Sequence, residues 1–193
     1  MSVEAKRLVD ARAAYPNLED GHPYDEVLFE VQVAAERSAS IGKADIGALM
    51  LWKRLNLSTP WTRDLNNMPD RDVRKITSTA VELARDPAVI APDAAEAARI
   101  ALLELPGCRH GQAIASTILT AGAPNRMAVY DERAVHGLDE LGHPDPQGKY
   151  SSYMTIVCSL LDVVHREHDT SWLARDIDKA LYIIGAPERN RDS

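Results

Sequence analysis

A short connection between two helical patterns carries the residue types that bind a phosphate. It runs from Leu105 to Gly111 with the sequence LPGCRHG. Its proline and glycine end the first helix, since proline cannot continue a helix and glycine accepts a positive φ. The second helix then begins with free backbone N–H groups near Gly107, Arg109 and Gly111. These donors and the helix dipole favour one phosphate, so the spacing predicts an anion-binding helical hairpin within residues 97–122.

Asp131 is the second feature with chemical potential. It lies 24 residues after Gly107 and stands directly before a helical pattern that continues through His136 and Leu138. Aspartate is one of the preferred residues at the N-terminal cap of a helix, because its carboxylate accepts a free N–H of the first turn. Capping alone accounts for Asp131, and capping is compatible with a catalytic role.

Together the two features resemble the helix-hairpin-helix DNA glycosylases. That family has the pattern LPGVGxxTA, a helix, and a V-x-D segment some two dozen residues later; here LPGCRHGQA and Val129-Tyr130-Asp131 take those places. The segment SWLARDIDKALYIIG is similar to the family's last helix, which contains a tryptophan and an arginine and packs behind the aspartate. The resemblance covers about residues 45–185 and is strongest over residues 97–138, and we expect a divergent member of this superfamily.

The resemblance implies base excision from DNA. Asp131 would be the catalytic carboxylate, which stabilises the oxocarbenium-like C1′ as the glycosidic bond breaks and orients the attacking water. The partner would be duplex DNA whose damaged or modified base is extruded from the stack. The residues expected to contact the DNA backbone are Gly107, Arg109, His110, Gly111 and Gln112.

Three departures from the family pattern restrict this interpretation. Arg109 replaces the second hairpin glycine, which either adds a phosphate contact or spoils the glycine conformation. Gly111 stands where bifunctional members place a lysine nucleophile, so Schiff-base lyase chemistry is not expected. A four-cysteine cluster is absent because the chain has only Cys108 and Cys158, and we expect neither a cofactor nor a metal site. The remaining possibilities are a monofunctional hydrolase and a protein that has lost its catalytic activity.

Aromatic residues near basic ones give further candidates for a base pocket or a DNA-facing surface. Trp52, Lys53 and Trp61 lie in a basic stretch, although tryptophans in helices more often belong to the core. Tyr130, next to Asp131, either lines a base pocket or is a buried tyrosine with a satisfied hydroxyl. We expect Cys108, in the hairpin, to be partly exposed.

The elements that must position these residues are helices. Aromatic residues make up only 5% of the chain whereas alanine, leucine and arginine are abundant, a balance that favours helices over strands. We predict an all-α multi-helix globule that forms a single domain over residues 1–193, with a flexible loop at 142–149. The expected helices span residues 3–14, 23–40, 46–53, 73–84, 94–104, 112–121, 131–138, 150–165 and 171–184, with a short helix beginning at Pro60.

Charge leaves other function classes open. The net charge of −7 argues at first against a nucleic-acid partner, although residues 51–85 carry seven basic and four acidic side chains. The runner-up is therefore a non-catalytic helix-hairpin-helix module that binds DNA or a protein, and a third hypothesis is a helical interaction protein unrelated to nucleic acid. The N-terminus has no apolar signal region and no apolar run has membrane length, so we expect a cytoplasmic protein without a membrane partner.

Overall fold

The computed structural model describes residues 1–18, 20–56 and 58–187. These residues form ten α-helices and two short 3₁₀-helices and contain no strand, which confirms the predicted all-α class. No helix among them is both long enough and apolar enough to cross a membrane. The elements are α1 (Val3–Ala13), η1 (Pro23–Asp25), α2 (Glu26–Ser38), α3 (Lys43–Trp52), α4 (Pro60–Asn67), α5 (Asp70–Arg85), α6 (Ala91–Ala101), η2 (Leu102–Glu104), α7 (Ala113–Gly122), α8 (Glu132–Glu140), α9 (Tyr150–Glu167) and α10 (Ala174–Ile184).

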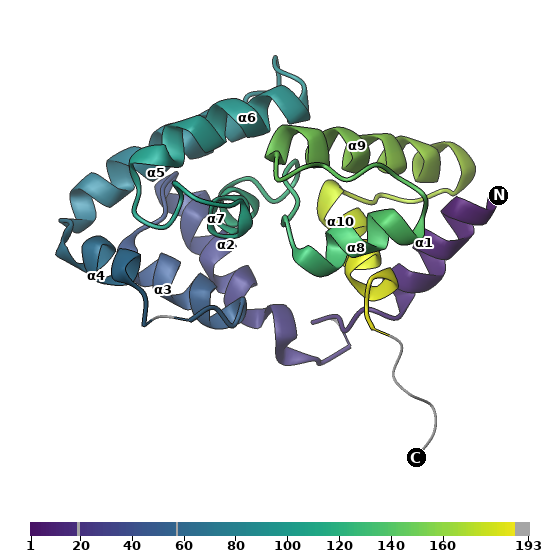
Figure 1. Cartoon of the computed structure of the whole chain (residues 1–193), viewed down its shortest axis with the longest axis horizontal. Coiled ribbons are helices and arrows are strands. Elements are labelled where there is room, and N and C mark those ends of the chain that lie inside the picture. Colours follow the sequence, from purple (N-terminus) through teal and green to yellow (C-terminus); the bar gives the residue numbers. More distant parts are fainter. Residues whose placement is uncertain (19, 57, 188–193) are drawn as a thin grey trace.

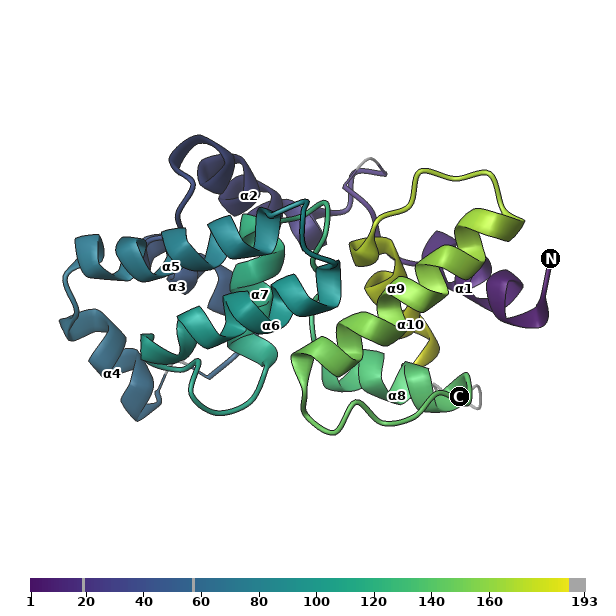
Figure 2. The ribbon, with the colours of Figure 1, turned by 90° about the horizontal axis from the view of Figure 1, so that it is seen from above.

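The helices lie in two groups, which Figures 1 and 2 show from two directions. The first helix, α1, packs with α8, α9 and α10, whereas α2 to α7 form the other group. The chain therefore begins in the group in which it ends. Helices α6 and α9 contact each other across the boundary, and one cluster of buried side chains runs through both groups.

Most helices form near where periodicity predicts them. Helices α3, α5 and α6 begin three residues earlier than expected, and two others begin in a different way. The segment predicted as one helix from Pro23 starts as η1 before α2 continues it. The last helix was expected from Ser171 but begins at Ala174, because the Asp176 carboxylate accepts the Leu173 N–H at 2.9 Å and so caps the helix there. Leu173 consequently stays outside the helix and is 38% exposed.

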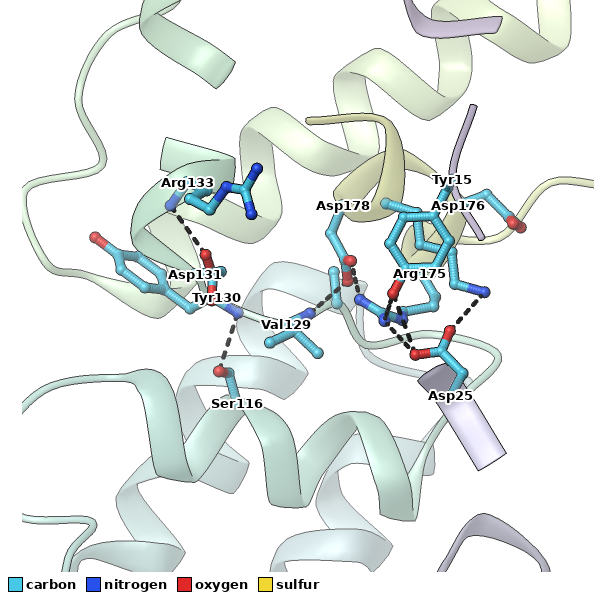
Figure 3. A network of polar contacts seen from close by, with 12 residues as sticks. Tyr15, Asp25, Ser116, Val129, Tyr130, Asp131, Arg133, Arg175, Asp176 and Asp178 are labelled. Atoms are coloured by element: carbon cyan, nitrogen blue, oxygen red, sulfur yellow. Dashed lines mark hydrogen bonds and ion pairs between the residues drawn. The ribbon is translucent and has the colours of Figure 1, made fainter. Parts of the chain in front are cut away.

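An extended segment, residues 127–131, carries the chain from α7 to α8 between the two groups. Its backbone donors are taken by side chains from both sides (Figure 3). The Val129 N–H donates to the Asp178 carboxylate of α10 at 2.6 Å, and the Tyr130 N–H donates to the Ser116 hydroxyl of α7 at 3.0 Å. Because a buried donor without a partner is costly, these two bonds fix the path of the segment.

The carbonyl groups of the same segment are satisfied by helix α9. The Tyr150 hydroxyl donates to the carbonyl oxygen of Ala128 at 2.7 Å, and the Tyr153 hydroxyl donates to that of Val129 at 3.1 Å. Both tyrosines are fully buried. Since the segment ends at Asp131, its anchors determine where that carboxylate lies.

Helices α8 and α10 approach closely enough that only glycine fits at their contact. A Cβ atom on Gly137 would lie 2.2 Å from the carbonyl oxygen of Leu181, and one on Gly185 would lie 1.9 Å from that of Arg133. Backbone atoms cannot move aside as a flexible side chain can. The two helices would therefore have to separate to accept a methyl group at either position.

Gly137→Ala is expected to lower the free energy of unfolding by about 1–3 kcal/mol, because overpacking forces the backbone apart. Urea denaturation followed by circular dichroism measures the change. The matched control is Gly47→Ala on α3, where a Cβ atom meets nothing within 4 Å. That substitution should raise stability by about 0.5–1 kcal/mol. A Gly137→Ala protein as stable as the parent would contradict the close contact.

Candidate functional site

Asp131 caps helix α8, as its position in the sequence predicts. One carboxylate oxygen accepts the Arg133 N–H at 2.9 Å, and the other is bound by the ammonium group of Lys53. Lys53 directly follows α3, so the ion pair joins the two groups of helices. The Lys53 side chain is 8% exposed and that of Asp131 is 26% exposed. Both carboxylate oxygens are thus engaged at a partly buried site.

The surroundings of Asp131 keep its carboxyl group ionised. Partial burial acts to raise the pKa of Asp131, but the charge and hydrogen bond of Lys53, together with the Arg133 N–H, more than offset this effect. The net result is a pKa below the ordinary value of 3.8. An ionised carboxylate stabilises positive charge on a neighbouring group and does not act as a proton donor at neutral pH.

Two cavities adjoin the Lys53–Asp131 ion pair, and both residues line both cavities. The first, here called the aromatic cavity, measures about 140 Å³ and takes side chains from both groups of helices. The second, here called the α7-side cavity, measures about 500 Å³ and reaches the first residues of α7. The aromatic cavity is lined by Tyr15, Tyr24, Trp52, Lys53, Arg54, Val129, Asp131, Arg133, Arg175, Asp178 and Tyr182.

The hairpin has the local geometry that its sequence predicts. Gly107 has φ +90° and Gly111 has φ +75°, whereas Arg109 is not among the described residues with positive φ. Arg109 therefore does not occupy a glycine conformation. Arg109, His110 and Gly111 are exposed. Within the described residues, the backbone N–H groups from Arg109 to Ala115 have no hydrogen-bond acceptor, as expected before and within the first turn of a helix.

Two side chains of the hairpin, those of Gln112 and Cys108, turn inward. The Gln112 amide is buried: its oxygen accepts from Arg99 at 2.6 Å, and its nitrogen donates to the Gly148 carbonyl at 2.7 Å. A contact from Gln112 to DNA would have to come from its backbone. Cys108 is fully buried, not partly exposed, and burial raises the pKa of its thiol to about 12.

The three aromatic candidates lie in three different places. Trp52 is 8% exposed, and its indole N–H donates to the buried Asp25 at 3.2 Å, so it forms a wall of the aromatic cavity from the core side. Trp61 packs behind the hairpin, where a Cβ atom on Gly107 would lie 2.8 Å from its ring. Tyr130 is half-buried, with its ring 5.0 Å from that of Tyr153, and it lines the α7-side cavity.

A network of buried charges stands behind the aromatic cavity (Figure 3). The Arg175 guanidinium binds the Asp178 carboxylate and lies 3.4 Å from Asp25. Asp25 also accepts the Tyr15 hydroxyl at 3.1 Å and pairs with Lys179 at 3.1 Å. Sequence reasoning did not single out these residues. The only local signal was the spacing of Arg175 and Asp178, which stand three residues apart on one face of α10.

Asp178→Ala is expected to lower the free energy of unfolding by about 3–5 kcal/mol, because it leaves the Val129 N–H and the Arg175 guanidinium without their partner. Asp178→Asn should cost clearly less. Burial raises the pKa of Asp178 to about 6, so its charge is itself unfavourable, and an amide oxygen still accepts the Val129 N–H. Asp162→Ala, at an exposed position of α9, is the control and should change stability by less than about 0.5 kcal/mol. Equal losses for Ala and Asn at position 178 would contradict this account.

Lys53→Met is expected to raise the pKa of Asp131, since the opposing effect of burial remains. A titration of the Asp131 carboxyl carbon by NMR measures this shift. In the parent protein the depressed pKa stabilises the fold above pH ~4, and this contribution is lost as the pH falls through the pKa of the folded state. Arg54→Met is the control and should leave the titration unchanged. A pKa of Asp131 that is the same in the Lys53→Met variant as in the parent protein would disprove the coupling.

No family model, no curated protein and no solved structure matches this chain. The resemblance to the helix-hairpin-helix glycosylases therefore stays a prediction that depends on the residues quoted for it. Among the described residues, no group of three or more His, Cys, Asp or Glu side chains could hold a metal ion.

Proposed function

We propose that this protein is a DNA base-excision glycosylase-like hydrolase, which cleaves the N-glycosidic bond of a modified or mismatched base. The observation that carries the proposal is the position of Asp131. Its ionised carboxylate lines both a small cavity with aromatic walls and a larger cavity at the start of α7. An extruded base in the first cavity and its sugar and phosphate in the second would put the glycosidic bond beside this carboxylate.

The start of α7 supplies the second element that the proposal needs. The α7-side cavity is lined by Gln112 and Ala113 as well as by Asp131. The free N–H groups and the dipole at this end of the helix favour a phosphate. Arg109 and His110 are exposed in the preceding turn and can contact the DNA backbone on the same side.

The chemistry follows from the charge of Asp131. The C1′–N bond breaks and its electron pair leaves with the base, so C1′ becomes positively charged in the transition state. The carboxylate stabilises this charge, water then adds to C1′, and the proton that the water loses goes to the departing base. The products are a free base and an abasic site. Because Lys53 covers one carboxylate oxygen in the free protein, its ammonium group has to move, and a DNA phosphate offers it another anion.

Lys53 also bears on the question of lyase activity. The hairpin has Gly111 where bifunctional members carry a lysine, but the fold brings the amine of Lys53 to Asp131 from α3. An ammonium group held in an ion pair has no lone pair for attack on C1′. We therefore propose hydrolysis without Schiff-base formation. Borohydride treatment during turnover should trap no covalent protein–DNA adduct.

The alternative function is a binding module that has kept the hairpin without the chemistry. Two observations favour it: both oxygens of Asp131 are engaged, and the chain is acidic overall. Such a module would bind DNA in a salt-dependent manner and release no base. A helical interaction protein unrelated to nucleic acid would show no DNA binding even at low salt.

Asp131→Asn is expected to reduce base release by at least about 100-fold, because it removes the charge that stabilises the transition state. Asparagine is an equally good helix cap, so α8 should remain folded. The assay measures free bases by mass spectrometry from duplex and single-stranded oligonucleotides that carry a panel of modified bases, at low salt. Asp139→Asn changes another exposed carboxylate of α8, which lines neither cavity, and should release base at the parent rate.

The outcomes separate the functions. Release that disappears only in the Asp131 variant supports hydrolysis. No release from any oligonucleotide, with DNA binding intact in both proteins, overturns the enzyme and supports the binding module. A protein that does not bind DNA at all overturns both the enzyme and the DNA-binding module.

A further inference from the structure

We infer that the aromatic cavity selects a neutral single-ring base that carries carbonyl oxygens, as uracil does, and rejects cationic alkylated bases. The inference builds on the proposed function and specifies its substrate class. It follows from four properties of the lining: its size, its unpartnered donors, its scarcity of free acceptors and its charge.

The size of the cavity suits one aromatic ring. Its volume is about 140 Å³, close to the ~150 Å³ of an engineered protein cavity that holds benzene. Tyr24 and Trp52 give it flat apolar walls, on which a planar heterocycle can stack. A two-ring purine would have to widen the cavity.

Two hydrogen-bond donors of the lining are unused. The Nε atoms of Arg133 and Arg175 are buried and have no hydrogen-bond partner among the described residues. The Nη1 atom of Arg133 donates to the Tyr182 hydroxyl at 2.6 Å, and Arg175 binds Asp178. Buried donors are normally satisfied, so a small turn of either side chain toward the cavity would let these two donate to acceptors on a ligand. Carbonyl oxygens of a base are such acceptors.

Free acceptors are scarce in the same lining. Both oxygens of Asp131 and both oxygens of Asp178 already accept hydrogen bonds. An exocyclic amino group, such as that of cytosine, therefore finds no free carboxylate there. The single ring N–H of a uracil-type base needs only one acceptor, and the hydroxyl of Tyr24 in the cavity lining can provide it.

The lining carries excess positive charge. Lys53 pairs with Asp131 and Arg175 pairs with Asp178. Arg54 and Arg133 also line the cavity, and neither has an ion-pair partner among the described residues. Arg133 lies 4.0 Å from the centre of the Tyr182 ring and so already uses the face that a cationic base would seek. A base with a positive charge is repelled at this site.

The experiment compares duplex oligonucleotides that differ in one base: uracil, cytosine, 3-methylcytosine, 8-oxoguanine or 3-methyladenine. Uracil and 3-methylcytosine share a ring size, but only the second is a cation at neutral pH. We expect uracil to be released at least about 100-fold faster than 3-methylcytosine or 3-methyladenine. The binding affinities of the Asp131→Asn protein for the same duplexes measure base recognition without catalysis.

Arg133→Met should slow uracil release by about 10- to 100-fold, the effect of losing a hydrogen bond from a charged donor. Arg133→Lys keeps the charge but lacks the Nε donor, so it should show most of the same loss of rate. Such a loss would exclude a purely electrostatic effect. The control is Arg63→Met on α4, an exposed side chain outside the cavity, which should leave the rate unchanged. Equal uracil release by the Arg133 variants and the parent overturns the assignment of the donor.

The outcomes keep the two proposals apart. Release of alkylated bases in preference to uracil supports the glycosylase and overturns the substrate class. No release, with tighter binding of uracil than of 3-methylcytosine duplexes by Asp131→Asn, supports the cavity's selectivity and overturns catalysis. No release and no discrimination in binding overturn both.

Discussion

The hydrogen bond from the Val129 N–H to the buried carboxylate of Asp178 is the constraint on which the site depends. The segment that crosses between the two groups of helices is extended, so its donors find no partners within their own element. A carboxylate from α10 provides one, and Arg175 connects that carboxylate to Asp25 on the other side of the cavity. The same contacts that satisfy the backbone therefore hold the two groups in one arrangement. Asp131 follows two residues later and takes its place from them.

Asp131 has two structural roles. As the cap of α8 it must offer an oxygen to the Arg133 N–H, and as the partner of Lys53 it must stay ionised in a partly buried place. Both demands lower the pKa of its carboxyl group, and both also occupy its oxygens. A carboxylate prepared in this way is charged but covered. An oxygen of this carboxylate becomes available only when the ammonium group of Lys53 binds another anion, such as a polyanionic partner would supply.

The overall charge of the chain is a poor guide to this site. The net charge is −7, yet the aromatic cavity is lined by four basic side chains and two acidic ones. The distinction matters because a ligand in a small cavity responds to the groups within a few ångströms, whereas distant surface charges are screened by salt. Acidic residues elsewhere therefore contribute little to the electrostatic potential inside the cavity.

The sequence by itself determined the local features. Helical periodicity placed the helices, aspartate chemistry placed the cap at Asp131, and the glycines of the hairpin predicted positive φ at Gly107. These features depend on neighbours within a few residues, so a local sequence pattern predicts them. The tertiary structure alone decided that Lys53 pairs with Asp131, that Arg175 reaches Asp25, and that Gln112 turns inward. Periodicity shows that a face is buried but not which distant residue covers it, because that choice depends on how whole helices pack.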